Sequence, residues 1–200
     1  MNKEIINTVE IRINDYLTTT NVEGPGSRFC IWVQGCSIHC NGCANKALWD
    51  KNGGITYDTK EIIDLIVSFK DKIEGITFLG GEPLDQIEAI TEISKAVREI
   101  GLSVLVFTGY VYEEIKDKAE IQELINFIDI LIDGKYEEDK QDFSRAWVGS
   151  SNQKYYFFTD KYDESIITQY KNKIEIRISS NNSVVMNGMG DFKKVLATMR

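Results

Sequence analysis

Short apolar segments alternate with amphipathic helical patterns along most of this chain. The apolar segments contain many aromatic and β-branched residues, and glycines lie at or near their ends, which is typical of buried strands. We expect such strands at residues 29–34, 76–79, 102–108 and 129–132. Apolar residues recur at helical spacing between them and predict helices at residues 60–72, 84–100 and 112–127. This alternation is characteristic of βαβ units, so the sequence predicts an α/β fold with a mostly parallel sheet.

The length and the composition favour one domain over residues 1–200. A chain of 200 residues with 42% hydrophobic and 27% charged residues has the size and composition of a single globular unit. No internal repeat, low-complexity tract or linker divides it. The later part predicts strands at residues 154–159, 173–179 and 183–187 and a helix from about residue 191. These elements either extend the sheet or form a small appendage.

The charge balance and the cysteine count restrict the classes of function. The formal net charge is −8, whereas non-specific nucleic-acid binding depends on clustered Lys and Arg, so we expect no nucleic-acid partner. No segment approaches the roughly 18 to 20 apolar residues that span a bilayer, and the N-terminus has no signal-type apolar run. We therefore expect a cytoplasmic protein without membrane contact. Its four cysteines stay reduced there and serve metal binding or catalysis.

Three cysteines lie close together in the loop that follows the first buried strand. Cys36, Cys40 and Cys43 occur in the sequence GCSIHCNGC. Three thiolates can hold a [4Fe-4S] cube and leave one iron open for a substrate. The alternative is a structural zinc site, which closes with four ligands.

A fourth ligand for zinc is hard to find in this sequence. Cys30 lies in the predicted strand, six residues before Cys36, which places it on the order of 15 to 20 Å from Cys36. We expect Cys30 to be an ordinary buried core thiol. His39, the only histidine, lies between two of the cysteines, and we expect its side chain to point away from the site. The residues by themselves leave zinc and an iron–sulfur cluster open.

A second motif gives the cysteine spacing a specific meaning. Gly80-Gly81-Glu82-Pro83 ends the next predicted strand, and Cys-x3-Cys-x2-Cys with a GGEP-type turn resembles the radical S-adenosylmethionine superfamily. The resemblance implies that the open iron binds the amino and carboxylate groups of S-adenosylmethionine. It also implies that the turn contacts the methionine amino group through backbone carbonyls. Gly80 and Gly81 suit that contact because glycine lets the backbone approach closely. The alternative role for Glu82 is a helix-start carboxylate.

Further motifs resemble one subgroup, the activating proteins of anaerobic ribonucleotide reductases, with the pyruvate formate-lyase activating enzymes as nearest relatives. These motifs are GPG at 24–26, the cysteine loop at 35–49, FTGY at 107–110, LIDGKY at 131–136 and WVGSSNQ at 147–153. The resemblance covers about residues 20–155 and leaves a C-terminal extension at about 156–200. Gly42 stands where many superfamily members have an aromatic residue near the adenine, and activators of this subgroup often have glycine there.

The resemblance implies a fold, a reaction and two partners. The fold is an incomplete (βα) barrel of the radical S-adenosylmethionine type. An electron from an external donor such as flavodoxin or ferredoxin enters the cluster, and S-adenosylmethionine is cleaved to methionine and a 5′-deoxyadenosyl radical. That radical removes a hydrogen atom from a glycine of a large glycyl-radical enzyme, here the anaerobic ribonucleotide reductase. The alternatives are a self-standing radical enzyme acting on a small molecule or peptide, and a binding or electron-carrier protein.

Three more residues are candidates for contact with S-adenosylmethionine. Thr108 and Asp133 end successive predicted strands, at the edge where parallel sheets and barrels place their ligands. Lys135 follows two residues later. The alternative for Thr108 and Asp133 is that each only forms a strand-ending turn.

Overall fold

The computed structural model describes residues 8–180 and 183–198, and its centre is one seven-stranded sheet with the order β3-β1-β2-β4-β5-β6-β7. The strands are β1 (Glu10–Thr20), β2 (Arg28–Val33), β3 (Ile55–Asp58), β4 (Gly75–Gly80), β5 (Ser103–Phe107), β6 (Ile130–Asp133) and β7 (Lys154–Phe157). Four of these strands were predicted as buried apolar runs, and all four form the middle of the sheet.

The middle of the sheet is parallel and its outer strands are antiparallel. β2, β4, β5 and β6 run parallel to one another, whereas β1 pairs antiparallel with β2, β3 with β1, and β7 with β6. The α/β fold is confirmed, and the sheet is mixed. The chain returns from β1 to β2 through a short loop and from β6 to β7 without a crossover helix, and such connections give antiparallel neighbours.

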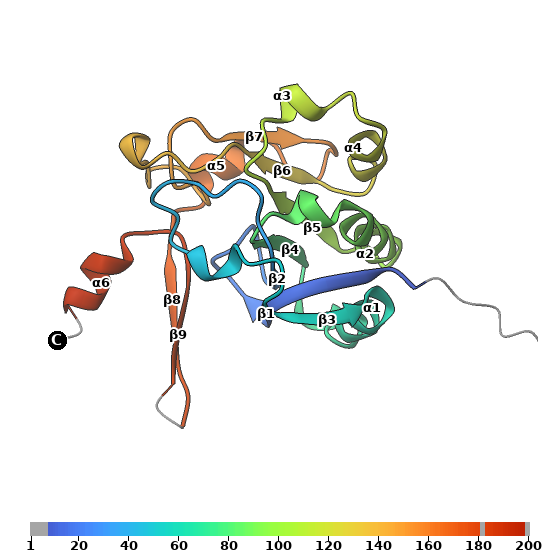
Figure 1. The fold of residues 1–200 in the computed structure, drawn as a ribbon, viewed down its shortest axis with the longest axis horizontal. Helices are drawn as coiled ribbons and strands as arrows, with labels where there is room; N and C mark the ends of the chain where they lie inside the picture. The colour runs from blue at the N-terminus through green and yellow to red at the C-terminus, as the bar shows by residue number, and fades with distance from the viewer. Residues whose placement is uncertain (1–7, 181–182, 199–200) are drawn as a thin grey trace, which may run out of the picture.

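The helices α1 (Thr59–Ser68), α2 (Ile87–Glu99) and α4 (Ala119–Leu124) lie on one face of the sheet (Figure 1). The Asp58 side chain accepts a hydrogen bond from the Lys60 N–H and caps α1. A 3-10 turn, Pro83–Gln86, precedes α2. The sequence did not predict β3 or the short helix α5 (Ser165–Gln169).

The prediction of one helix over residues 112–127 is wrong. The chain forms α3 (Tyr112–Ile115) and then α4, separated by Lys118 in an extended conformation. Ile115 and Ile121 are both buried, but six positions apart their side chains would point about 120° apart around one continuous helix, at 100° per residue. The break lets both side chains face the core.

Hydrophobic residues cover both faces of the central strands. In β5, Val104 and Val106 belong to the core under the helices, whereas Leu105 belongs to a second core on the other face. Trp147 and Ile166 cover that second face. Burial on both faces explains why these strands appear in the sequence as continuous apolar runs without alternation.

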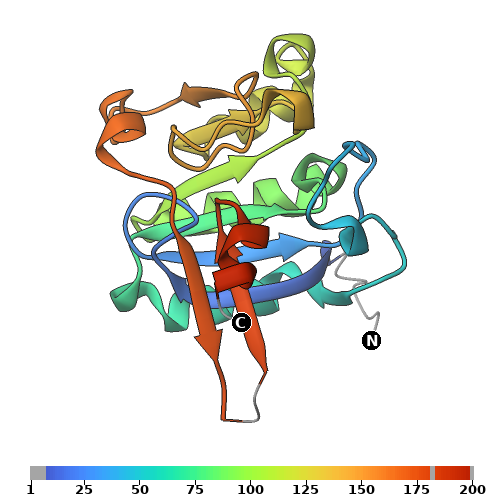
Figure 2. The same cartoon turned by 90° about the vertical axis from the view of Figure 1, so that its left-hand side faces the viewer.

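The strand predicted at residues 154–159 joins the main sheet as β7, whereas residues 174–198 form an appendage on the second face. β8 (Ile174–Ile178) and β9 (Val184–Gly188) make a separate two-stranded antiparallel sheet, followed by α6 (Phe192–Thr198). This hairpin lies on the side of the sheet opposite α1 and α2 and projects beyond the body of the protein (Figures 1 and 2). The buried Glu23 carboxylate anchors it by accepting hydrogen bonds from Asn187 Nδ2 and the Gly188 N–H. A single domain over residues 1–200 stays a prediction.

Within the described ranges, no helix combines the length and the apolar character needed to cross a membrane.

Candidate functional site

The cysteine loop leaves the carboxyl end of β2 and is closed at its base. The Gly35 N–H donates to the Leu48 carbonyl at 2.9 Å, and the Cys36 N–H donates to the Trp49 carbonyl at 3.4 Å. The Gln34 side chain lies under this closure, and its Nε2 donates to the Asp50 carbonyl at 2.6 Å. The loop is therefore a defined structure that begins where the parallel sheet ends.

The GGEP turn is hydrogen-bonded directly to the start of this loop. The Gly81 N–H donates to the Val33 carbonyl and the Glu82 N–H donates to the Gly35 carbonyl, both at 2.8 Å. A Cβ on Gly81 would overlap the Gly35 carbonyl oxygen, and one on Gly80 would lie 2.7 Å from the β2 backbone. Gly80 also has a φ of 107°, which favours glycine. Two motifs that are 44 residues apart in the sequence thus become one backbone unit.

The Glu82 carboxylate joins this unit to the turn after β5. It is buried and accepts hydrogen bonds from Thr108 Oγ1 at 2.8 Å, the Gly109 N–H at 2.7 Å and the Leu84 N–H at 2.9 Å. Burial raises the pKa of Glu82 to about 7, and these hydrogen bonds act in the opposite direction. The bond from Leu84 is the helix-start contact that was considered for Glu82. The hydroxyl of Thr108 has the carboxylate as its partner.

Three side chains that the sequence reasoning missed bring the same elements together at the surface. Asp85 accepts hydrogen bonds from Ser37 Oγ at 2.7 Å, from the Ser37 N–H at 2.8 Å and from the Tyr110 hydroxyl at 3.0 Å. Asp85 and Tyr110 lie in or beside the GGEP and FTGY motifs. Their position in those motifs was the only signal in the sequence, and it does not show that they meet.

Backbone N–H groups surround the three thiols. The Asn45 N–H donates to Cys43 Sγ at 3.3 Å. Burial raises the pKa of the Cys36 thiol, while two backbone N–H groups of its own loop donate to it and lower the pKa. Burial also raises the pKa of Cys40, and the backbone of Tyr136, which belongs to a different loop, acts in the opposite direction. Donors of this kind stabilise thiolate ligands and tune the reduction potential of iron–sulfur clusters.

The donor type of these residues suits an iron–sulfur cluster, because protein thiolates are its usual ligands. Within residues 8–180 and 183–198, no three His, Cys, Asp or Glu side chains converge as one bound ion requires. Zinc needs all its ligands within about 2.3 Å of one point, whereas each thiolate of a [4Fe-4S] cube binds a different iron. Cys30 is fully buried in β2, as predicted. His39 stacks on Trp49 with ring centroids 4.5 Å apart.

The remaining candidate residues lie in different surroundings. The Asp133 carboxylate is buried and accepts hydrogen bonds from the Tyr112 N–H at 2.7 Å and the Lys154 N–H at 3.2 Å, so it holds the start of α3 and β7. Burial raises the pKa of Asp133. Lys135 instead lines a cavity of about 620 Å³ that also includes Cys40. Gly42, with a φ of 76°, lies against the Glu138 side chain, where a Cβ would approach the carboxyl carbon to 2.9 Å.

Sequence comparison identifies the proteins to which this chain is similar. A family model described as a 4Fe-4S single cluster domain matches residues 22–156. The anaerobic ribonucleoside-triphosphate reductase-activating protein of Pasteurella multocida (strain Pm70) is 36% identical over an alignment of 151 residues that covers 72% of this chain and 96% of the relative. The chain belongs to this family of activating proteins.

Two other members of the family show the same extent of similarity. The activating protein of Escherichia coli (strain K12) is 36% identical over 149 residues, covering 70% of this chain and 94% of the relative. That of Enterobacteria phage T4 is 33% identical over 145 residues, covering 70% of this chain and 89% of the relative. The resemblance inferred from the motifs is confirmed. Since the family model ends at residue 156, the C-terminal appendage lies outside the matched region.

Proposed function

We propose that this chain activates anaerobic ribonucleotide reductase by generating a glycyl radical on it. In this proposal Cys36, Cys40 and Cys43 hold a [4Fe-4S] cluster, and S-adenosylmethionine binds at the open iron. The observation that carries the proposal is the pair of backbone hydrogen bonds from Gly81 and Glu82 to the base of the cysteine loop. They place a glycine turn suited to close ligand approach beside the loop that holds the three thiols.

When bound, the cluster and S-adenosylmethionine supply one-electron cleavage of the sulfonium and a carbon radical that removes a hydrogen atom. The protein's own residues orient and enclose these groups. Gly80 and Gly81 let the methionine portion approach the backbone, and the Glu82 carboxylate keeps their turn in register with the cysteine loop. Lys135 contacts the cofactor from the cavity beside Cys40, and Gly42 lets the Glu138 side chain pack against the cysteine loop on that side. Thr108 and Asp133 lie at strand ends beside the proposed cofactor site. Thr108 binds Glu82 and Asp133 binds the start of α3. These contacts hold the turns that face the cofactor.

We also infer that the sheet forms the incomplete barrel of the radical S-adenosylmethionine type. The order β2-β4-β5-β6 within the sheet, with helices on one face, supports this fold. An incomplete barrel leaves a lateral opening through which a glycine-bearing loop of the large reductase subunit can reach the cofactor. An external donor such as flavodoxin or ferredoxin supplies the electron, and the reaction takes place in the cytoplasm.

The membership in the activating-protein family supports the activase over a self-standing radical enzyme acting on a small molecule or peptide. Electron paramagnetic resonance tests the choice, with the purified reductase subunit, a chemical reductant and S-adenosylmethionine present. A doublet from a glycyl radical on the reductase is the expected result. Formation of 5′-deoxyadenosine without that signal would contradict the activase role and leave the radical chemistry intact. An unchanged cluster spectrum on addition of S-adenosylmethionine would contradict the cofactor assignment itself.

A further inference from the structure

The segment that follows β6 forms one wall of the cavity beside Cys40. Residues 135–139 of this segment and residues 38–41 of the cysteine loop line the cavity. Tyr136 and Cys40 both line this cavity. Apart from the 3-10 turn Glu138–Lys140, residues 134–140 belong to no helix or strand. Contacts from another part of the chain must therefore hold the segment in place.

Two amide side chains supply such contacts. Gln153 Nε2 donates to the Gly134 carbonyl at 2.9 Å, and Asn152 Nδ2 donates to the Lys135 carbonyl at 2.8 Å. These carbonyls directly precede Tyr136, which lines the cavity together with Cys40. The two amides thus fix the backbone one and two residues away from the contact with the cysteine loop.

The neighbouring residues extend the attachment along the segment. The Glu137 N–H donates to Ser150 Oγ at 3.2 Å, and the Ser151 N–H donates to the Lys140 carbonyl at 2.8 Å. The loop of residues 149–153 therefore holds the segment at both of its ends and in its middle. Hydrogen bonds at several points restrict both the position and the orientation of a segment without regular structure.

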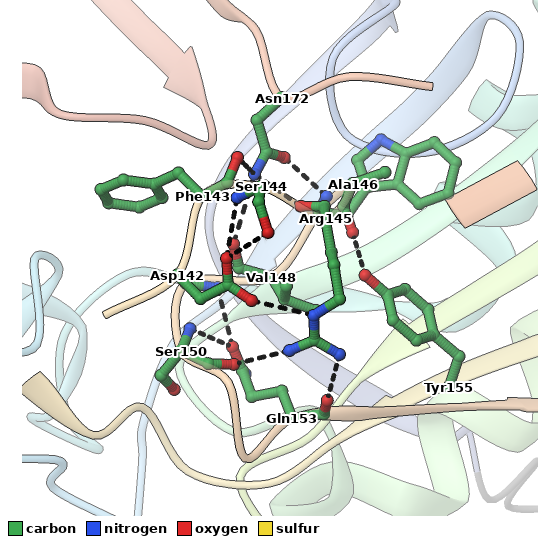
Figure 3. Close-up of polar contacts among 12 residues, drawn as sticks. Asp142, Phe143, Ser144, Arg145, Ala146, Val148, Ser150, Gln153, Tyr155 and Asn172 are labelled. Carbon is green, nitrogen blue, oxygen red and sulfur yellow. Dashed lines mark hydrogen bonds and ion pairs between the residues drawn. The ribbon is translucent and has the colours of Figure 1, made fainter. Parts of the chain in front are cut away.

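The holding loop is itself rigidly built. Gln153 Oε1 accepts hydrogen bonds from the Gly149 N–H at 2.8 Å and the Ser150 N–H at 3.2 Å. The Arg145 guanidinium donates to the Ser150 carbonyl at 3.1 Å and the Gln153 carbonyl at 3.0 Å, and it pairs with Asp142 at 2.9 Å (Figure 3). A single Gln153 amide thus closes its own loop with its oxygen and holds the segment with its nitrogen.

We propose that Gln153 and Asn152 are positioning residues that hold residues 134–140 against the Cys40 side of the cysteine loop. They control access to the Cys40 sulfur and keep the wall of the cavity in place. The identity of the molecule that occupies the cavity rests on the proposed function, whereas the positioning does not. An amide is required at position 153 because a carboxylate of the same shape accepts hydrogen bonds but donates none.

The test uses the full-length, metal-free protein under anaerobic, reducing conditions. Alkylation by N-ethylmaleimide is followed at each cysteine by mass spectrometry, together with amide hydrogen exchange of residues 134–140. Gln153→Glu keeps the acceptor oxygens and removes the donor to Gly134. We expect alkylation of Cys40 to become about fivefold faster and exchange in the segment to rise, with Cys43 unchanged. Gln122→Glu is the matched control, because Gln122 Nε2 also donates to a backbone carbonyl, that of Lys116, on the surface near α4.

Asn152→Asp provides a second, independent variant that removes the donor to Lys135, and it carries the test if Gln153→Glu does not unfold cooperatively. Rates at Cys40 equal to those of the wild-type protein in the folded variants would overturn the inference. An equal rise at Cys36, Cys40 and Cys43 would also overturn it, because that pattern shows general loosening of the cysteine loop.

A separate measurement distinguishes this inference from the proposed function. The protein reconstituted with iron and sulfide is titrated to obtain the midpoint potential of its cluster, with and without Gln153→Glu. Displacement of the segment changes the hydrogen bonding and solvent exposure around Cys40 and should shift the potential. If S-adenosylmethionine leaves the spectrum of the reconstituted cluster unchanged while the Cys40 result holds, the proposed function fails and the positioning role stands. An unchanged potential in Gln153→Glu would contradict a contact between the segment and the cluster.

Discussion

The buried Glu82 carboxylate and the Thr108 hydroxyl are hydrogen-bonded at 2.8 Å across the carboxyl ends of β4 and β5. The same carboxylate accepts a hydrogen bond from the Gly109 N–H. Because the Glu82 N–H donates to the Gly35 carbonyl, the turn after β5 is linked through one residue to the base of the cysteine loop. Glu82 therefore couples the stability of the sheet at the carboxyl ends of β4 and β5 to the geometry of the candidate site.

Replacing Glu82 should change how stability depends on pH. Burial raises its pKa to about 7 from the usual value of 4.5, so the folded protein binds a proton more readily than the unfolded chain between these values. The stabilising contribution of Glu82 is then present below pH 4.5 and is lost as the pH rises to 7. The advantage of the wild-type protein over Glu82→Gln should shrink by on the order of 1 kcal/mol per pH unit. Urea unfolding of the metal-free proteins at several pH values measures this difference.

A suitable control for Glu82→Gln is Glu114→Gln, which changes an exposed carboxylate. Its unfolding free energy should follow that of the wild-type protein across the pH range. Parallel curves for the wild-type protein and Glu82→Gln would contradict the raised pKa of Glu82.

Gly81→Ala should disrupt the junction between the two motifs. A Cβ at this position would overlap the Gly35 carbonyl oxygen, and the backbone on both sides is hydrogen-bonded. Overpacking of this kind costs about 1 to 3 kcal/mol, and the shift of the cysteine loop should also reduce reconstituted iron content. Gly101→Ala is the control, since Gly101 has a φ of 82° and an added methyl group would meet no atom within 4 Å. It should lower stability through backbone strain alone and leave iron content unchanged. Equal iron loss in both variants would sink the explanation.

We expect three of the cysteines to bind the cluster and the fourth, Cys30, to be a core thiol. Replacing Cys36, Cys40 or Cys43 by Ala should reduce iron after anaerobic reconstitution well below the about four atoms of a complete cube. Cys30→Ala should keep the iron and lower the unfolding free energy by about 1 kcal/mol, because it removes a fully buried side chain. Iron and sulfide assays with chemical denaturation measure both effects. Loss of iron in Cys30→Ala with an otherwise folded protein would contradict the assignment.

Asn172→Ala should loosen the connection between the C-terminal part of the chain and residues 143–148. Asn172 Oδ1 accepts a hydrogen bond from the Trp147 N–H at 2.6 Å, and its Nδ2 donates to the Arg145 carbonyl at 2.7 Å (Figure 3). Trp147 has a φ of 60°, a conformation that needs support from its surroundings. We expect a loss of about 2 kcal/mol and faster hydrogen exchange at residues 143–148.

Asn126→Ala is the control for Asn172→Ala, because Asn126 Nδ2 also donates to a backbone carbonyl, that of Gln122 at 2.7 Å, but at an exposed position. Its effect should stay below about 0.5 kcal/mol. Equal stability of the two variants would show that Asn172 does not hold this region.

The central strands and the cysteine loop were accessible from the sequence because their signals are local. Each middle strand is a run of buried apolar residues, and the three cysteines lie within eight positions. Helix α2 was equally clear from its apolar spacing, and Gly101, with a φ of 82°, lies just after its end. In contrast, β3 has only partly buried or exposed residues, so it lacks the hydrophobic pattern that identifies a strand.

The contacts of Thr108 and Asp133 with S-adenosylmethionine stay predictions, whereas the structure shows which protein groups these two side chains bind. Thr108 was assigned from its position at a strand end, and the structure gives its hydroxyl to Glu82. Asp133 was assigned in the same way, and its carboxylate holds the backbone of Tyr112 and Lys154. The strand-end position was correctly identified in both cases. The direction and the partners of each side chain depend on neighbouring strands that are distant in the sequence.

The sequence by itself determined the α/β class, the position of the cysteine loop at the end of a strand and the family to which the chain belongs. These features follow from residue type and short-range spacing. Only the tertiary structure decided that the GGEP turn is bonded to Val33 and Gly35, and that Gln153 and Asn152 hold the segment over Cys40. The reason is that parallel pairing and loop packing bring together backbone groups whose partners no local pattern specifies.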